Sequence, residues 1–147
     1  MECKLEETRI NEQVKIGLGH YADSYEFTSV AESAVTAGRF ARTNPFVSIE
    51  LSRTSLVRAI QILETRLGLV REREHEFVRK LSWSQRLTDF EPHLSRAVVR
   101  NMKDLLKRRD GAVYRDEPVS GAQAGTAYGN LLEFLRKAFA EDNSAKR

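Results

Sequence analysis

The residues best suited to a chemical role are six cations in one short segment, Arg96, Arg100, Lys103, Lys107, Arg108 and Arg109. The first four recur at steps of four, three and four residues, and at about 100° per residue this spacing places them on one face of a helix. Between Leu94 and Arg109 the only acid is Asp104, so the segment has a formal charge of +5 in a chain whose total is +3. A cationic surface this concentrated predicts a polyanionic partner, most commonly nucleic acid.

The spacing of the cations also indicates how nucleic acid would be bound. From Arg96 to Lys107 the row would span ~16 Å, enough to meet several phosphates of a duplex backbone. Neutralising four to six phosphates would give a slope of log affinity against log salt of about −3.5 to −5.5. No aromatic residue interrupts the row, and nothing in it demands base reading, so we expect a duplex partner and little sequence specificity.

Other interpretations of the same segment remain open. Lys and Arg normally occupy the solvated side of a helix, so the row also fits an ordinary exposed face. A membrane partner is disfavoured because the face opposite the charge lacks Trp and Phe. We infer no small-molecule substrate.

The remaining reactive residues do not form a metal or catalytic motif. His20, His75 and His93 are widely spaced, and the residue four positions after His75 is Arg79 rather than a second histidine. Cys3 is the only cysteine, which excludes an intramolecular disulfide and a cysteine metal site. Serines without a paired base carry no catalytic signal. We therefore expect a non-enzymatic protein without metal or cofactor.

One spacing points to an enzymatic alternative. Arg86 and His93 are separated by six residues. This spacing resembles the Arg-x(4-6)-His signature of the HEPN ribonucleases, which are helical bundles. The resemblance implies a dimer in which Arg86 and His93 attack RNA.

Pieces of the first half are similar to ribbon-helix-helix antitoxins. They are Val14–Gly17 with His20 and Tyr21, Val35–Phe40, and Leu56–Glu64. The resemblance implies a dimer whose paired strands enter a DNA groove and whose tail inhibits a toxin. Residues 43–55 intervene where the second helix of that family should begin, and a strand, a short helix and a heptad helix account for the same residues.

The cations require a helix, and the flanking sequence predicts one. Thr88–Glu91 resembles a capping box, with Asp89 as N-cap and Pro92 in the first turn. Asp110 and Gly111 are expected to end the helix. Its buried face would consist of Leu94, Val98, Met102 and Leu105.

Two further helices are predicted in the second part of the chain. After Leu51 the apolar residues follow steps of four and three up to Leu81, and Ser52 or Ser55 would cap this heptad helix. Its face forms either a bundle core or a dimer interface made by Leu56, Ile60, Leu63, Leu67 and Val70. If the dimer interface is the functional surface, the protein is a regulatory or antitoxin-like interaction protein. A last helix, from Gln123 to Ala140, would bury Tyr128, Leu131, Phe134, Leu135 and Ala138.

Before Leu51 the apolar residues mostly alternate, which is typical of short strands. The alternating sets are Val14, Ile16 and Leu18, then Tyr25 and Phe27, then Val47, Ile49 and Leu51. A short helix from Val30 to Ala37 would end at Gly38.

Together these elements predict a helix-dominated α+β fold, in which a small N-terminal antiparallel strand unit packs against three C-terminal helices. We expect one domain, with a strand-rich part at 1–51, a helical part at 52–141 and a flexible tail at 142–147. The composition, 41% hydrophobic and 31% charged, is typical of a folded chain. No secretory signal and no run of about 18 apolar residues is present, which indicates a soluble cytoplasmic protein.

Overall fold

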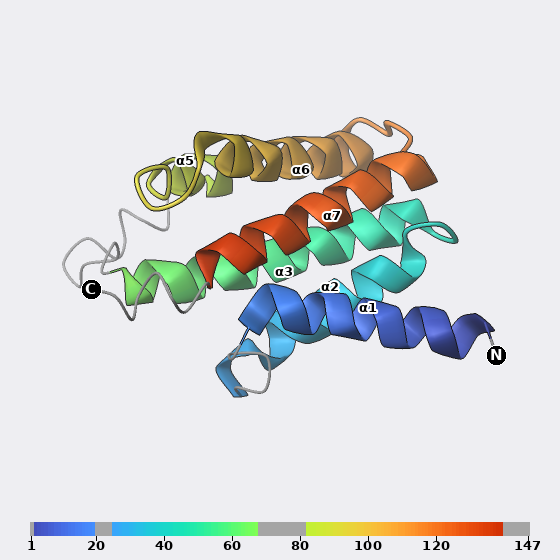
Figure 1. Cartoon of the computed structure of the whole chain (residues 1–147). Coiled ribbons are helices and arrows are strands. Elements are labelled where there is room, and N and C mark those ends of the chain that lie inside the picture. The colour runs from blue at the N-terminus through green and yellow to red at the C-terminus, as the bar shows by residue number, and fades with distance from the viewer. Residues whose placement is uncertain (1, 20–24, 68–81, 140–147) are drawn as a thin grey trace.

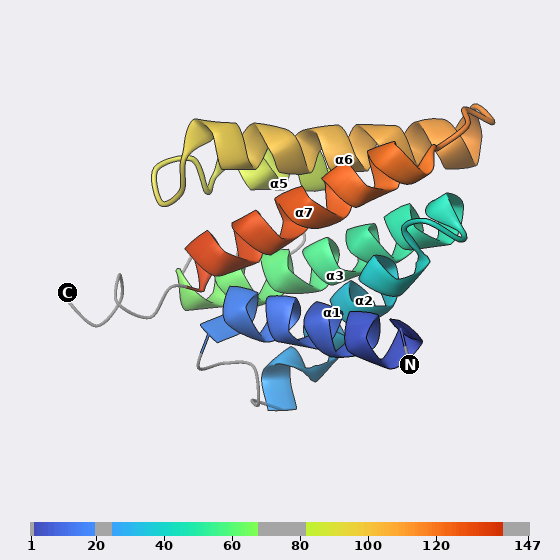
Figure 2. The same ribbon diagram turned by 45° about the vertical axis from the view of Figure 1, so that its right-hand side comes forward.

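The chain folds into helices stacked in three layers (Figures 1 and 2). The computed structural model describes residues 2–19, 25–67 and 82–139. In chain order its elements are α1 (Glu2–Leu18), the 3-10 helix η2 (Tyr25–Phe27), α2 (Thr28–Phe40), α3 (Pro45–Arg66), α5 (Trp83–Thr88), α6 (Arg96–Tyr114) and α7 (Gly121–Ala138). Helices α3 and α7 form the middle layer, with α1 and α2 on one side and α5 and α6 on the other. The N-terminal half is therefore helical like the rest.

Side-chain caps determine where four of these helices begin. In each, the capping oxygen accepts a hydrogen bond from the backbone N–H three residues later; the capping residues are Asn44, Ser82, Ser95 and Ser120. At Ser82 and Ser120 a glutamine three residues on bonds back to the cap N–H, which completes a capping box. Each cap contributes about 1 kcal/mol.

The predicted buried faces of the two C-terminal helices are confirmed. On α6, Val98, Met102 and Leu105 are buried, and Leu94 packs against the same core from the preceding turn. On α7 the buried residues include Tyr128, Leu131, Phe134 and Leu135, whereas Ala138 is half-buried. The α6 helix therefore turns one side to the core and the other side outward.

The predicted N-terminal strand unit is wrong, because the described residues contain no β-strand. Val14, Ile16 and Leu18 lie in α1, where Val14 and Leu18 are buried and Ile16 is 68% exposed. Ile10, Val14 and Leu18 recur every four residues, which is the spacing of a helix face. Three alternating residues fit the period of a strand as well as that of a helix. The four-residue repeat that begins at Ile10 identifies the helix.

The other two strand predictions fail in the same region. Tyr25 and Phe27 belong to η2, and Val47, Ile49 and Leu51 lie in the first turns of α3. The buried face of α3 there includes polar residues, which hid its helical period.

Three buried serines form much of that face. Ser48 Oγ donates to the Ala37 carbonyl at 2.7 Å, and Ser55 Oγ donates to the Val30 carbonyl at 2.9 Å. Ser52 Oγ is buried without a hydrogen-bond partner among the described residues. These small side chains allow α2 and α3 to approach closely, while two of the three hydroxyls are satisfied by α2 carbonyls.

The boundaries of α3 also differ from the prediction. The helix begins at Pro45 with Asn44 as its N-cap, so Ser52 and Ser55 are interior residues and not caps. Proline is favoured in the first turn, where its missing N–H costs nothing. The helix ends at Arg66, and the predicted continuation through 68–81 lies outside the described residues, as does the tail at 142–147.

The start of the cationic helix is corrected as well. Ser95 is its N-cap, because its Oγ accepts from the Val98 N–H at 3.1 Å. Asp89 instead caps the C-terminal end of the short helix α5, and Pro92 lies in the turn between α5 and α6. Two capped helices therefore occupy the region where one capping box was predicted.

Two helices continue a few residues past the glycines that were predicted to end them. Helix α6 continues through Asp110 and Gly111 to Tyr114, where the backbone N–H groups of Arg115 and Glu117 fold back to bond the Gly111 carbonyl at 3.0 and 3.1 Å. A Cβ at position 111 would meet the carboxylate of Glu117, which is the end of a flexible, exposed side chain and can shift. The short helix predicted at Val30–Ala37 is confirmed as part of α2, which extends past Gly38 to Phe40.

None of the described helices has the length and apolarity needed to span a lipid bilayer.

Candidate nucleic-acid interface

Helix α6 lies in an outer layer of the bundle (Figures 1 and 2). Its exposed side carries four of the six predicted cations. Arg96, Arg100, Lys107 and Arg108 are exposed. Within the described part of the chain, none of these four side chains pairs with a carboxylate. Among the residues that the structure describes, no ion pair therefore neutralises these four charges.

Lys103 belongs to the same row but is half-buried. Its Nζ donates a hydrogen bond to Thr88 Oγ1 on α5 at 2.7 Å. Because the hydroxyl is neutral, this bond orients the ammonium group without neutralising its charge, and Lys103 forms no ion pair within the described ranges. Together these five residues, Arg96, Arg100, Lys103, Lys107 and Arg108, are called the α6 row below.

Arg109 differs from the α6 row. Its Nε lies 2.5 Å from Glu50 Oε1 on α3, and its Nη1 lies 3.2 Å from Asp110 Oδ1. The hydrogen bond to Glu50 raises the pKa of the Arg109 guanidinium, and the Tyr114 ring lies 5.8 Å from its central carbon. Arg109 therefore connects α6 to α3, whereas the sequence had grouped it with the phosphate contacts.

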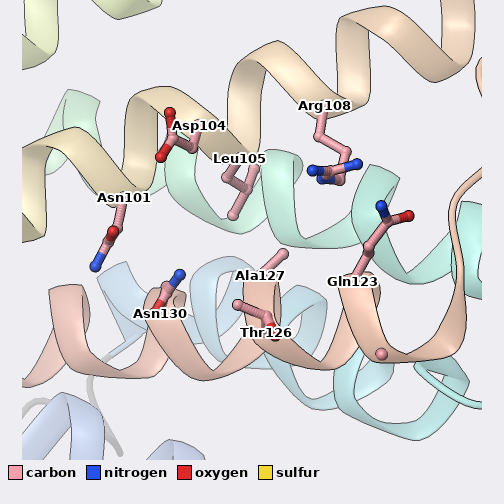
Figure 3. A pocket seen from close by; sticks show the side chains of 9 residues that line it. Asn101, Asp104, Leu105, Arg108, Gln123, Thr126, Ala127 and Asn130 are labelled. Atoms are coloured by element: carbon pink, nitrogen blue, oxygen red, sulfur yellow. The ribbon is translucent and has the colours of Figure 1, made fainter.

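A groove of about 380 Å³ runs between α6 and α7 beside the α6 row (Figure 3). Asn101, Asp104 and Arg108 line it from α6, and Gln123, Thr126 and Asn130 line it from α7. We call it the amide groove, since Asn101, Gln123 and Asn130 supply both hydrogen-bond donors and acceptors. It depends on how two helices pack, so periodicity within either helix could not predict it.

A second groove, of about 580 Å³, lies among α3, α5 and α6. Its walls include Arg53 of α3, Trp83 of α5, and Lys103, Lys107 and Tyr114 of α6. We call it the aromatic groove. The sequence analysis missed Arg53, Trp83 and Tyr114, because only the tertiary packing brings them beside the α6 row. The Ser82–Gln85 capping box would have revealed the short helix that carries Trp83.

Within the single chain, no hydrogen bond, ion pair or ring contact joins the described residues Arg86 and His93. The Arg86 Nε donates to Glu64 Oε2 at 2.8 Å, a second nitrogen bonds the other carboxylate oxygen, and the guanidinium lies 3.9 Å from the centre of the Trp83 ring. His93 is exposed in the turn between α5 and α6, and no contact joins it to Arg86. Arg86 thus links α5 to α3.

Most of the predicted heptad face lies inside the bundle. Leu56 and Ile60 are fully buried and Leu63 is 5% exposed, all within the core of a single chain. Leu67 is 38% exposed, and Val70 lies outside the described residues. The bundle therefore uses the first three side chains for its own packing.

Among the described residues no three His, Cys, Asp or Glu side chains gather closely enough to hold a metal ion; His20 and His75 lie outside them. Comparisons of the chain with protein families, with characterised proteins and with solved structures gave no match.

Proposed function

We propose that this protein binds nucleic acid without catalysis, and that the α6 row contacts the phosphate backbone. The observation that carries the proposal is a row of five cations on one helix with no carboxylate partner among the described residues. Each exposed cation that meets a phosphate releases a counterion, which is the dominant source of affinity in binding that does not depend on sequence.

Another helix of the same bundle shows how an ordinary solvated face is arranged. On α7, Arg136 lies 2.5 Å from Glu133, and Lys137 lies 3.9 Å from the same carboxylate. On α6, Arg96 and Arg100 are like charges four residues apart, which repel slightly. An anion bound along α6 would remove this repulsion, which supports a role for the row beyond solvation.

The amide groove supports the same proposal. Amide groups beside a row of cations can donate hydrogen bonds to phosphate and sugar oxygens. These oxygens accept a large share of the hydrogen bonds in protein–DNA complexes. Asn101 and Asn130 line this groove next to Arg108. The α6 row would supply the affinity, and the amide groove would fix the position of the backbone.

A membrane partner fits the fold less well. A helix that lies in a bilayer surface inserts its apolar face into the lipid. The apolar face of α6, with Val98, Met102 and Leu105, is buried in the bundle. The proposal therefore places the protein in the cytoplasm, where nucleic acid is the abundant polyanion.

The test is a salt-titrated binding measurement with single-stranded and duplex forms of DNA and RNA. If all five cations of the row meet phosphates, the slope of log affinity against log salt should be about −4.5 on a duplex and about −3.5 on a single strand. Sequence changes in the nucleic acid should alter the affinity little. Absence of binding to all four at low salt would contradict the proposal, and cleavage of the RNA that disappears in His93→Ala would replace it with the ribonuclease alternative.

A further inference from the structure

We infer that the aromatic groove holds an unpaired nucleotide of a single-stranded nucleic acid, an inference that rests on the proposed function. The groove opens beside the α6 row and shares Lys103 and Lys107 with it. A strand bound along the row therefore passes the mouth of the groove. Its volume of about 580 Å³ lies within the range of small-ligand sites.

The charges in the groove fit a phosphate. Arg53, Lys103 and Lys107 line it from two helices, and none of them pairs with a carboxylate among the described residues. The two other cations of the groove are already paired: Arg109 with Glu50, and Arg115 with Glu117 at 3.0 Å. Asp104, an exposed carboxylate with no ion pair among the described residues, also lines the groove, so its unpaired charges sum to +2 and favour an anion.

The aromatic side chains fit a base. Trp83 lines the groove, and Arg86 lies 3.9 Å from the centre of its ring. Because Arg86 is itself fixed by two bonds to Glu64, the Trp83 ring is held in place before any ligand arrives. Tyr114, which is 73% exposed, stands at the end of α6. Rings beside cations are the arrangement with which proteins bind unstacked bases.

This arrangement changes what the row is expected to bind. The absence of aromatic residues within the cationic segment favoured a duplex, but the packing of α5 against α6 places Trp83 beside Lys103 and Lys107. Bases in a duplex are stacked on one another and do not present a free face to a protein ring. The groove therefore favours a strand end or a single-stranded stretch.

The experiment uses Trp83, the only tryptophan of the chain, as its own probe. The full-length protein is titrated with fluorescein-labelled octauridylate, with a short blunt RNA duplex and with free uridine monophosphate. Anisotropy of the label reports binding anywhere on the protein, whereas unlabelled copies of the same oligonucleotides report through tryptophan fluorescence. We expect octauridylate to quench Trp83, and the duplex to bind without quenching it.

The variant Tyr114→Ala should weaken octauridylate binding roughly 5- to 150-fold, the loss expected for one stacked base, and should leave duplex binding unchanged. Tyr25→Ala is the matched control, because Tyr25 is 94% exposed and lies on η2, away from the groove. It should behave like the unaltered protein.

The outcomes separate the two proposals. If no oligonucleotide changes the anisotropy, the proposed function fails. If octauridylate binds but neither quenches Trp83 nor responds to Tyr114→Ala, the proposed function stands and the groove assignment is overturned. If uridine monophosphate quenches Trp83 at concentrations as low as octauridylate does, the groove binds free nucleotides, and its assignment to a nucleic-acid strand is overturned.

Discussion

Two groups of cations in this bundle have opposite environments. Arg86 and Arg109 are largely buried and contact Glu64 and Glu50 of α3, so they join the α5–α6 layer to the middle of the molecule. The α6 row faces outward and has no carboxylate partner among the described residues. The difference shows that the arginines connecting helices are paired with carboxylates, whereas the α6 row forms no ion pair among the described residues, even with Asp104 on the same helix. Paired arginines should therefore control stability, and the α6 row should control binding.

The largest effect on stability is expected at the Arg86–Glu64 pair. Glu64 is 4% exposed, so Arg86→Ala leaves a buried carboxylate without its partner and should lower the free energy of unfolding by about 3–5 kcal/mol. Urea denaturation followed by circular dichroism measures this loss. The double variant Glu64→Leu with Arg86→Met should lose less, because no charge is then left alone in the core. A single variant as stable as the unaltered protein would contradict the structural role.

A smaller loss of stability is expected at Arg109. The Arg109 side chain is 15% exposed and that of Glu50 is 35% exposed, so Glu50→Ala should lower the free energy of unfolding by about 1–3 kcal/mol. The salt slope of Arg109→Ala on a duplex should be that of the unaltered protein, because Arg109 is paired with Glu50 and is not expected to meet a phosphate. A clear change in slope for Arg109→Ala would show that Arg109 contacts phosphate together with the α6 row.

Lys107 should behave in the opposite way. Lys107→Ala removes an exposed, unpaired cation, so the free energy of unfolding should change by less than about 0.5 kcal/mol. The salt slope on a duplex should become shallower by about 0.9, which corresponds to one phosphate contact. Denaturation and salt-titrated anisotropy on the same protein sample give both quantities. A stable variant with an unchanged slope would remove Lys107 from the interface.

The smallest effects on stability are expected at the buried hydroxyl groups of α3, which differ in whether they have a hydrogen-bond partner among the described residues. Ser55→Ala removes a hydroxyl bonded to the Val30 carbonyl and should cost about 1 kcal/mol. Ser52→Ala removes a buried hydroxyl that has no partner among the described residues, so it should be neutral or slightly stabilising. Thermal denaturation of the two variants should place Ser55→Ala below Ser52→Ala. The reverse order would show that the partner of the hydroxyl does not matter at this interface.

The sequence predicted the second half of the fold better than the first. The apolar faces of α6 and α7 extend over several turns, so their period is unambiguous. In the first half, Val14, Ile16 and Leu18 fit two periods, and the serines of α3 concealed a buried face. Polar residues that are buried because they fit a close helix contact carry no hydrophobic signal, so periodicity could not detect them.

The candidate interface was predictable to the extent that it lies on one helix. The α6 row follows from spacing and charge alone. Glu50 pairs with Arg109 and so keeps it out of the α6 row, and Arg53 and Trp83 line the same groove as Lys107. Both arrangements depend on contacts between residues far apart in the chain. Such contacts follow from the packing of whole helices, which a single sequence does not specify.

The most direct test of the account compares two variants with the same change of net charge. One reverses four exposed cations of the α6 row: Arg96→Glu, Arg100→Glu, Lys107→Glu and Arg108→Glu. The control reverses four exposed cations elsewhere: Arg9→Glu, Lys15→Glu, Arg42→Glu and Arg58→Glu. Circular dichroism establishes that both are folded before their affinity for octauridylate and for a duplex is measured against salt.

The account predicts that reversal of the α6 row lowers the affinity by at least about 100-fold and brings the salt slope close to zero, whereas the control keeps most of its slope. Equal losses in the two variants would show that only net charge matters. A folded α6-row variant that binds with unchanged affinity and slope would contradict the central claim.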